Sequence, residues 1–112
     1  MEVLNQEKIN RLASEIGEEN VPVLLQIFLG ELSNYIENLQ ADPEDKTQYL
    51  KEISHALKSS AASFGAEVLC EYAIEIDTHA KTGQGFNQSD SKEKMIELLK
   101  LTYQHYAQLV AQ

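Results

Sequence analysis

The chain has 112 residues, of which 18 are acidic, 9 are basic and 43% are hydrophobic, and its formal net charge is −9. This length suits one domain, residues 1–112, and the composition is that of a globular protein rather than a disordered one. The acidic excess argues against nucleic-acid binding, because Arg11 is the only arginine and no basic surface is available to neutralise phosphates.

The sequence also lacks the marks of membrane insertion and secretion. It contains no run of about 20 apolar residues and no charged, apolar signal segment at its start, so we expect a cytoplasmic protein with no membrane partner. Cys70 is the only cysteine, which excludes an intramolecular disulfide and a cysteine-rich metal site. We expect Cys70 to be a small, partly buried packing residue.

The first two predicted helices lie in the N-terminal third of the chain. Asn5 is expected to cap the first helix and Gly17 to end it. Asn20 is expected to cap the second helix, which carries Pro22 in its first turn. The apolar stripe predicted for the second helix consists of Leu24, Ile27, Phe28, Leu32, Tyr35, Ile36 and Leu39.

Three further helices are predicted in the rest of the chain. The third is expected to open at Asp42-Pro43 and to stop near Gly65. The fourth follows almost at once, ends at Gly83 and turns Leu69, Ala73, Ile76 and Ala80 inward. After a loop over residues 83–89, a capping box of Asp90 and Glu93 is expected to start the fifth helix. The predicted buried face of the fifth helix consists of Met95, Leu98, Leu99, Thr102, Tyr106 and Leu109.

Every long segment of the chain has helical periodicity, and none has the alternation of a strand. Four long helices joined by short turns predict an all-α fold, an antiparallel up-and-down four-helix bundle. The short first helix is extra, and we expect it to cover one end or the side of the bundle.

The third helix carries the most informative pattern. At about 100° per residue, its apolar residues lie within about 80° of Ile53 on one side, and His55 lies almost opposite them. Lys51, Lys58, Ser59 and Ala62 share the side of His55. The pattern predicts a single exposed imidazole surrounded by small and basic side chains, although an ordinary surface histidine would fit the position alone.

The three histidines could also serve as packing residues or metal ligands. His79 and His105 lie at the edges of their apolar faces, where packing against neighbouring helices is the expected role. Glu52 and His55 match the Glu-x-x-His element of di-iron bundles, but that site needs two such elements pointing inward. Here one copy occurs and it faces outward, so we expect no metal site, and no nucleotide-binding motif is present.

An exposed histidine without catalytic companions suits the transport of a phosphoryl group between proteins. Imidazole is a good nucleophile near neutral pH, because it is then largely uncharged. Phosphoryl transfer needs mainly positioning and charge neutralisation, and Lys58 could supply positive charge one turn along. Ser59 and Ala62 are small enough for a partner's active site to settle over the helix.

The segment His55-Ala-Leu-Lys58-Ser-Ser-Ala-Ala-Ser-Phe-Gly65 resembles the motif of the histidine phosphotransfer (HPt) family. That motif is His-x-x-Lys-Gly, followed by small residues and a later glycine. The resemblance implies that His55 is phosphorylated, that Lys58 neutralises charge, and that Gly65 ends the helix so that the next helix can pack closely. Ser59 departs from the usual glycine. We assign partner docking to Lys51, Ser59, Ala62 and Gly65.

Over most of its length the chain is similar to HPt members of quorum-sensing relays. This similarity implies that the receiver domains of hybrid sensor histidine kinases donate the phosphoryl group and that a LuxO-type response regulator accepts it. We expect a monomeric carrier without autokinase activity, because Ala56 stands where kinases place an acidic residue and no ATP-binding domain follows. No cofactor is expected, with Mg²⁺ only in the partner receivers. The alternative is a non-catalytic helical adaptor that binds a signalling partner through the third helix.

Overall fold

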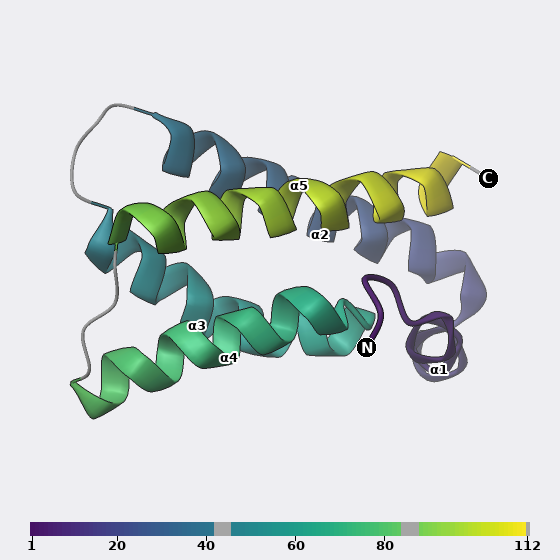
Figure 1. The fold of residues 1–112 in the computed structure, drawn as a ribbon. Helices are drawn as coiled ribbons and strands as arrows, with labels where there is room; N and C mark the ends of the chain where they lie inside the picture. The colour runs from purple at the N-terminus through teal and green to yellow at the C-terminus, as the bar shows by residue number, and fades with distance from the viewer. Residues whose placement is uncertain (42–45, 84–87, 112) are drawn as a thin grey trace.

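The structure is a computed structural model that describes residues 1–41, 46–83 and 88–111. Every element in these ranges is helical, as predicted. The elements are α1 (Gln6–Ile16), the 3₁₀ helix η1 (Glu18–Asn20), α2 (Val21–Gln40), α3 (Thr47–Phe64), α4 (Glu67–Thr82) and α5 (Gln88–Ala111). In Figure 1, α2 and α5 form one pair of helices, α3 and α4 form the other, and α1 lies across one end.

The predicted ends of the first two helices are largely confirmed. The side chain of Asn5 accepts a hydrogen bond from the Glu7 N–H at 3.0 Å, and Gly17 ends α1 with a φ of 93°. Asn20 precedes α2 and Pro22 lies in its first turn, but Asn20 does not cap α2 with its side chain. Its Nδ2 instead donates to the Ile16 carbonyl at 2.6 Å, because the 3₁₀ helix turns Asn20 back towards α1.

Helices α3 and α5 begin at Thr47 and Gln88. The proposed opening of the third helix at Asp42-Pro43 lies outside the described residues, and α3 begins at Thr47. The fifth helix begins at Gln88, two residues before the predicted cap, so Asp90 lies inside the first turn of α5. An acidic residue there still interacts favourably with the positive end of the helix dipole.

Aromatic stacking joins the two helix pairs. The Phe28 ring of α2 stacks on Phe64 of α3 at 4.5 Å and meets the edge of Tyr106 of α5 at 5.2 Å. The predicted faces of α4 and α5 are buried or packed against the core, apart from Ala80 near the end of α4, which is half-buried. The placement of Ile27 in the core was wrong: Ile27 is 63% exposed beside Val23, since α2 has more apolar residues than one face can bury.

The junction between α3 and α4 depends on Gly65. This residue has a φ of 79° and ends α3 in the left-handed conformation. The Asn5 N–H donates to its carbonyl at 2.8 Å, and the Tyr106 hydroxyl donates to the carbonyl of Phe64 at 2.6 Å. These contacts fix α1 and α5 to the turn, so α4 can return along α3 after two intervening residues, Gly65 and Ala66.

We expect Gly65→Ala to lower the free energy of unfolding by about 2–4 kcal/mol. A Cβ at Gly65 would lie 2.8 Å from the Asn5 carbonyl oxygen and 2.8 Å from Lys8 Cβ, in a conformation that alanine disfavours. Gly30→Ala is the matched control, because a Cβ there has nothing within 4 Å and alanine favours the helix. Urea unfolding measures both, and equal midpoints for the two variants would contradict this role of Gly65.

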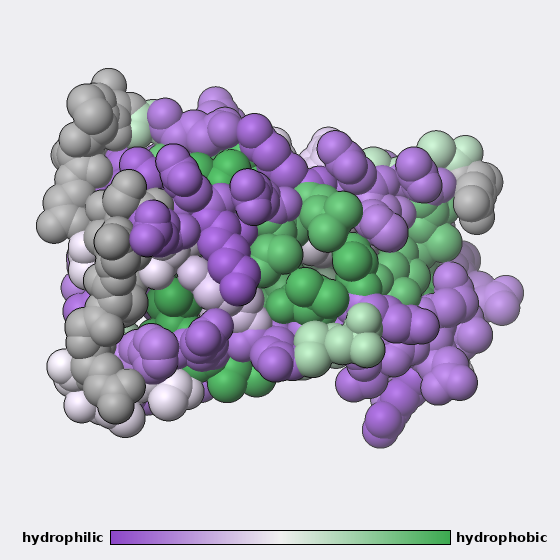
Figure 2. Space-filling model, in the orientation of Figure 1, coloured by the Kyte–Doolittle hydropathy of each residue, from purple (hydrophilic) through white to green (hydrophobic). Residues whose placement is uncertain are grey.

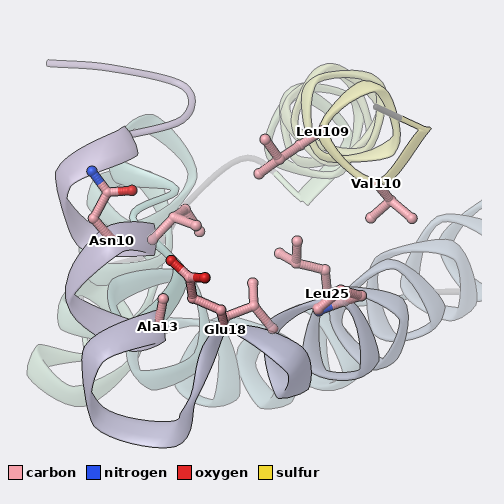
Figure 3. Close-up of a pocket in the computed structure, with 9 residues that line it drawn as sticks. Asn10, Ala13, Glu18, Leu25, Leu109 and Val110 are labelled. Atoms are coloured by element: carbon pink, nitrogen blue, oxygen red, sulfur yellow. The ribbon is translucent and has the colours of Figure 1, made fainter.

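Apolar side chains reach the surface of the bundle in more than one place. Figure 2 shows apolar side chains gathered in the middle of one face, between α5 and α4. A mostly apolar pocket of about 250 Å³ lies at the α1 end, lined from α1, the start of α2 and the end of α5, and including Asn10, Glu18 and Leu25 (Figure 3). Within the ranges that the structure describes, no helix is long and apolar enough to cross a membrane.

Candidate functional site

His55 lies on the outer side of α3, as helical periodicity predicted. Its side chain is 66% exposed, while Leu50, Ile53 and Leu57 on the opposite side are buried. Ser54, the neighbouring hydroxyl, is completely buried in the core. The imidazole is therefore a nucleophile that a partner can reach on this helix.

The structure adds a residue that the sequence analysis missed. Asp77 of α4 lies beside His55, with 3.3 Å between its Oδ1 and His55 Nδ1. Its other oxygen, Oδ2, is 2.6 Å from Lys58 Nζ and 3.0 Å from Lys81 Nζ. Although Asp77 is charged, its side chain is only 7% exposed. One buried carboxylate thus connects the exposed imidazole to two lysines.

The lysines keep this carboxylate ionised. Hydrogen bonds from Lys58 and then from Lys81 hold the pKa of Asp77 far below its ordinary value, and they outweigh burial, which acts in the opposite direction. In return, the hydrogen bond to Asp77 raises the pKa of Lys58. Asp77 therefore carries its negative charge throughout the physiological pH range, and Lys58 carries its positive charge.

An ionised carboxylate determines which ring nitrogen of His55 is free. A carboxylate can only accept a hydrogen bond, so the neutral imidazole that binds it carries its proton on Nδ1. The lone pair then lies on Nε2, on the far side of the ring from Asp77. The site presents an oriented nucleophilic nitrogen away from the body of the protein.

The antiparallel packing of α3 and α4 brings these residues together. The helices meet through the short turn at Gly65, so residues 22 positions apart in the chain lie side by side. A signal for Asp77 exists in the sequence: it stands four residues after Ala73 and three before Ala80, within the apolar stripe of α4. A single acidic residue in such a stripe needs a cationic partner within reach, on its own helix or on the facing one.

The remaining candidate residues play no visible part in this cluster. His79 is half-buried, as expected for a packing histidine, whereas the packed position predicted for His105 was wrong because its side chain is exposed. Cys70 is half-buried, burial raises the pKa of its thiol, and its Sγ lies 3.6 Å from the Lys58 carbonyl oxygen. The part of the chain that is described contains no group of three or more His, Cys, Asp or Glu able to hold a metal ion.

Three of the four predicted docking residues lie on the accessible surface. Ser59 and Ala62 are exposed and Lys51 is partly exposed. Ala62 lines two adjoining hollows, one towards α1 of about 320 Å³ and one towards α4 of about 600 Å³. We refer to Lys51, Ser59 and Ala62, the predicted docking residues that are accessible, as the docking surface. Gly65 does not belong to it: this residue is buried against α1, so its contribution is to the fold.

Comparison with known proteins agrees with this fold and indicates the family. Residues 23–109 match the Hpt domain family. The chain is 59% identical to phosphorelay protein LuxU of Vibrio cholerae over 110 residues, which is 97% of each chain. It is 55% identical to LuxU of Vibrio harveyi, over 94% of this chain and 93% of that one.

The fold has a counterpart of more distant sequence. Histidine-containing phosphotransfer protein B of Pseudomonas aeruginosa superposes with a TM-score of 0.80 at 22% identity, over 97% of this chain and 95% of that one. This likeness supports the helical architecture, while the family match and the LuxU relatives identify the kind of protein. The chain belongs to the Hpt domain family and is a histidine phosphotransfer protein.

Proposed function

We propose that this protein carries a phosphoryl group on Nε2 of His55. It takes the group from the receiver domain of hybrid sensor histidine kinases and passes it to a LuxO-type response regulator in quorum sensing. The observation that carries the proposal is the contact between the exposed His55 ring and the buried, ionised Asp77, at 3.3 Å from Nδ1. This contact leaves Nε2 free to attack.

The transfer needs no proton movement at His55. The Nε2 lone pair attacks the phosphorus of the receiver's aspartyl phosphate, the N–P bond forms, and the P–O bond breaks as the aspartate leaves. The ring keeps its Nδ1 proton and becomes a positively charged phosphoimidazolium. Asp77, which accepts a hydrogen bond from that N–H, stabilises the charge, much as a carboxylate stabilises the imidazolium of a catalytic triad. Transfer to the response regulator is the reverse reaction on a second receiver.

Lys58 is the residue we assign to charge neutralisation. It lies one turn after His55 on the same side of α3, and its side chain is 31% exposed. Its ammonium can reach from Asp77 towards the phosphoryl oxygens by rotation of a flexible side chain. The charge developing in a phosphoryl-transfer transition state is spread over those oxygens, so a nearby cation favours transfer in both directions.

We propose that the protein has no autokinase activity and does not use ATP itself. Hpt carriers are in general not kinases and need no cofactor, and we assign the Mg²⁺ of the reaction to the partner receivers. The residue after His55 is Ala56, so no carboxylate stands there to assist phosphorylation by a kinase domain. We also propose a cytoplasmic, monomeric protein with a single domain, residues 1–112, because one chain supplies all the helices of the bundle.

The test of this function is transfer of labelled phosphate from a phosphorylated receiver domain. We expect the label on this protein to be labile in acid and stable in base, as a phosphohistidine is. Incubation with labelled ATP alone is the control and should give no label. Failure to take up phosphate from any receiver, with binding retained, would favour the adaptor function, and label from ATP alone would contradict the proposed lack of autokinase activity.

We expect Ala62→Arg to weaken receiver binding at least about tenfold, because a long side chain would stand between the two hollows of the docking surface. Gln104→Arg on α5 is the matched control, since it adds the same charge at an exposed position on a helix that packs mainly against α2. Titration calorimetry with the receiver measures both. If Ala62→Arg binds as tightly as Gln104→Arg, the docking surface lies elsewhere.

A further inference from the structure

One oxygen of the buried Asp77 carboxylate binds two ammonium groups. Lys58 reaches Oδ2 from α3 at 2.6 Å, and Lys81 reaches the same atom from α4 at 3.0 Å, while Oδ1 faces His55. Lys81 lies one turn after Asp77 on the same helix, so its contact does not depend on α3. One ammonium suffices to balance one carboxylate, and the second therefore calls for an explanation.

Phosphorylation changes the charge balance of this cluster. The phosphoryl group brings about two negative charges close to Lys58, and the ring gains one positive charge. Lys58 can turn to the phosphoryl oxygens, because its side chain is partly exposed and flexible. Asp77 cannot follow, because its side chain is 7% exposed and held on α4. Once Lys58 turns away, the buried carboxylate needs another cation, since an unpaired buried charge is strongly unfavourable.

We propose that Lys81 is a positioning residue that remains on Asp77 when Lys58 turns to the phosphoryl group. It keeps the carboxylate ionised and aligned with the Nδ1 proton of the phosphorylated ring. Lys81 acts through Asp77 and does not touch the phosphoryl group. The inference rests on the proposed function, because it requires His55 to carry the phosphoryl group.

The positions of the two lysines on different helices give them different roles. Lys58 shares α3 with His55, so it moves with the phosphorylated ring, while Lys81 shares α4 with Asp77, so it moves with the carboxylate. Lys81 is 60% exposed, and its loss does not leave a hole in the core. The role is therefore specific to the phosphorylated state, because in the resting state Lys58 alone can pair with Asp77.

Phosphoramidate provides a test that needs no partner for loading, because it phosphorylates histidine directly and releases ammonia. The full chain is loaded as wild type, Lys81→Gln, Lys58→Gln and the double variant. Lys100→Gln on α5 serves as the charge-matched control at another exposed position. Nitrogen-15 NMR of the imidazole is recorded before and after loading, and the transfer rate to the receiver domain of a response regulator is measured.

For Lys81→Gln we expect the His55 ring signals of the unloaded protein to stay unchanged and the Nδ1–H signal of the loaded protein to shift. We expect transfer to slow about 2- to 5-fold, which is the effect expected from the loss of one partly exposed ion pair. In the double variant the slowing should exceed the product of the single effects, because Asp77 then has no cation in either state. Lys81→Arg should restore the rate, because arginine supplies the same charge.

Three outcomes would overturn the inference. If loaded Lys81→Gln has the same Nδ1–H signal and transfer rate as Lys100→Gln, Lys81 does not support Asp77 in the phosphorylated state. If the His55 ring signal of Lys81→Gln shifted equally in the unloaded and loaded forms, the role of Lys81 would be merely structural. Absence of phosphate on His55 in the wild type, from phosphoramidate and from a phosphorylated receiver alike, would overturn the proposed function itself and this inference with it.

Discussion

Replacing His55 by glutamine is expected to abolish phosphoryl uptake from a phosphorylated receiver domain while leaving the fold and partner binding intact. Glutamine is polar and of similar reach, but its amide nitrogen is not a nucleophile, so no N–P bond can form. The side chain at this position is 66% exposed, and the free energy of unfolding should change by no more than about 0.5 kcal/mol. Phosphate transfer, receiver binding and urea unfolding are measured on the same preparation.

The matched control is His105→Gln, which removes the other exposed histidine from a different helix, α5. It should take up phosphate at the wild-type rate. Ser54 cannot replace His55 as the acceptor, because its side chain is completely buried. Label on His55→Gln would mean that a different residue receives the phosphoryl group. If His55→Gln lost receiver binding as well as transfer, this variant would not distinguish a phosphoryl carrier from an adaptor. The urea unfolding curve would then show whether the loss of binding comes from a loss of folding.

The exposure of His55 could be predicted because it depends on one helix alone. Helical periodicity places Leu50, Ile53 and Leu57 on one side, and the position of His55 opposite them follows without knowledge of any other element. The same holds for the end of α3, since Gly65 is a strong local signal for a left-handed helix end. The exposed imidazole suggested phosphoryl transport, and the resemblance to a family motif implied the role of each of these positions.

Asp77 could not be predicted with the same ease, because its role depends on two helices. Its proximity to His55 follows from the packing of α4 on α3, and the relative rotation of two helices is set by side-chain packing across the whole interface. The exposure of Ile27 likewise depends on how one helix packs against another. Its apolar character suggested burial, but α2 packs mainly against α5 through a different face, and Ile27 remains exposed.

Asp77→Asn is expected to slow phosphoryl transfer on the order of 10- to 100-fold without removing the nucleophile. An amide cannot balance the positive charge of the phosphoimidazolium ring. Its NH₂ group can also donate to Nδ1, which would move the ring proton to Nε2 and block the attacking atom. Transfer kinetics give the rate, and nitrogen-15 NMR of His55 reports which ring nitrogen carries the proton.

Glu75→Gln is the control for Asp77→Asn, because it removes a carboxylate from an exposed position on the same helix. It should leave both the transfer rate and the tautomer of His55 unchanged. Wild-type transfer by Asp77→Asn, with the Nδ1 proton still in place, would exclude Asp77 from the mechanism. Slower transfer with an unchanged tautomer would indicate that charge, rather than proton placement, is the contribution of Asp77.

The dependence of stability on pH provides an independent check on the state of Asp77. Its pKa is lowered on folding by Lys58 and Lys81, so ionised Asp77 contributes stability that is present above its unfolded pKa, near 4, and lost as the pH falls below it. The difference in unfolding free energy between wild type and Asp77→Asn should therefore be constant from about pH 6 to 8 and shrink in acid. If the difference in unfolding free energy grew as the pH fell, Asp77 would be protonated in the folded protein. A protonated Asp77 could not form ion pairs with the two lysines and could not orient His55 through them.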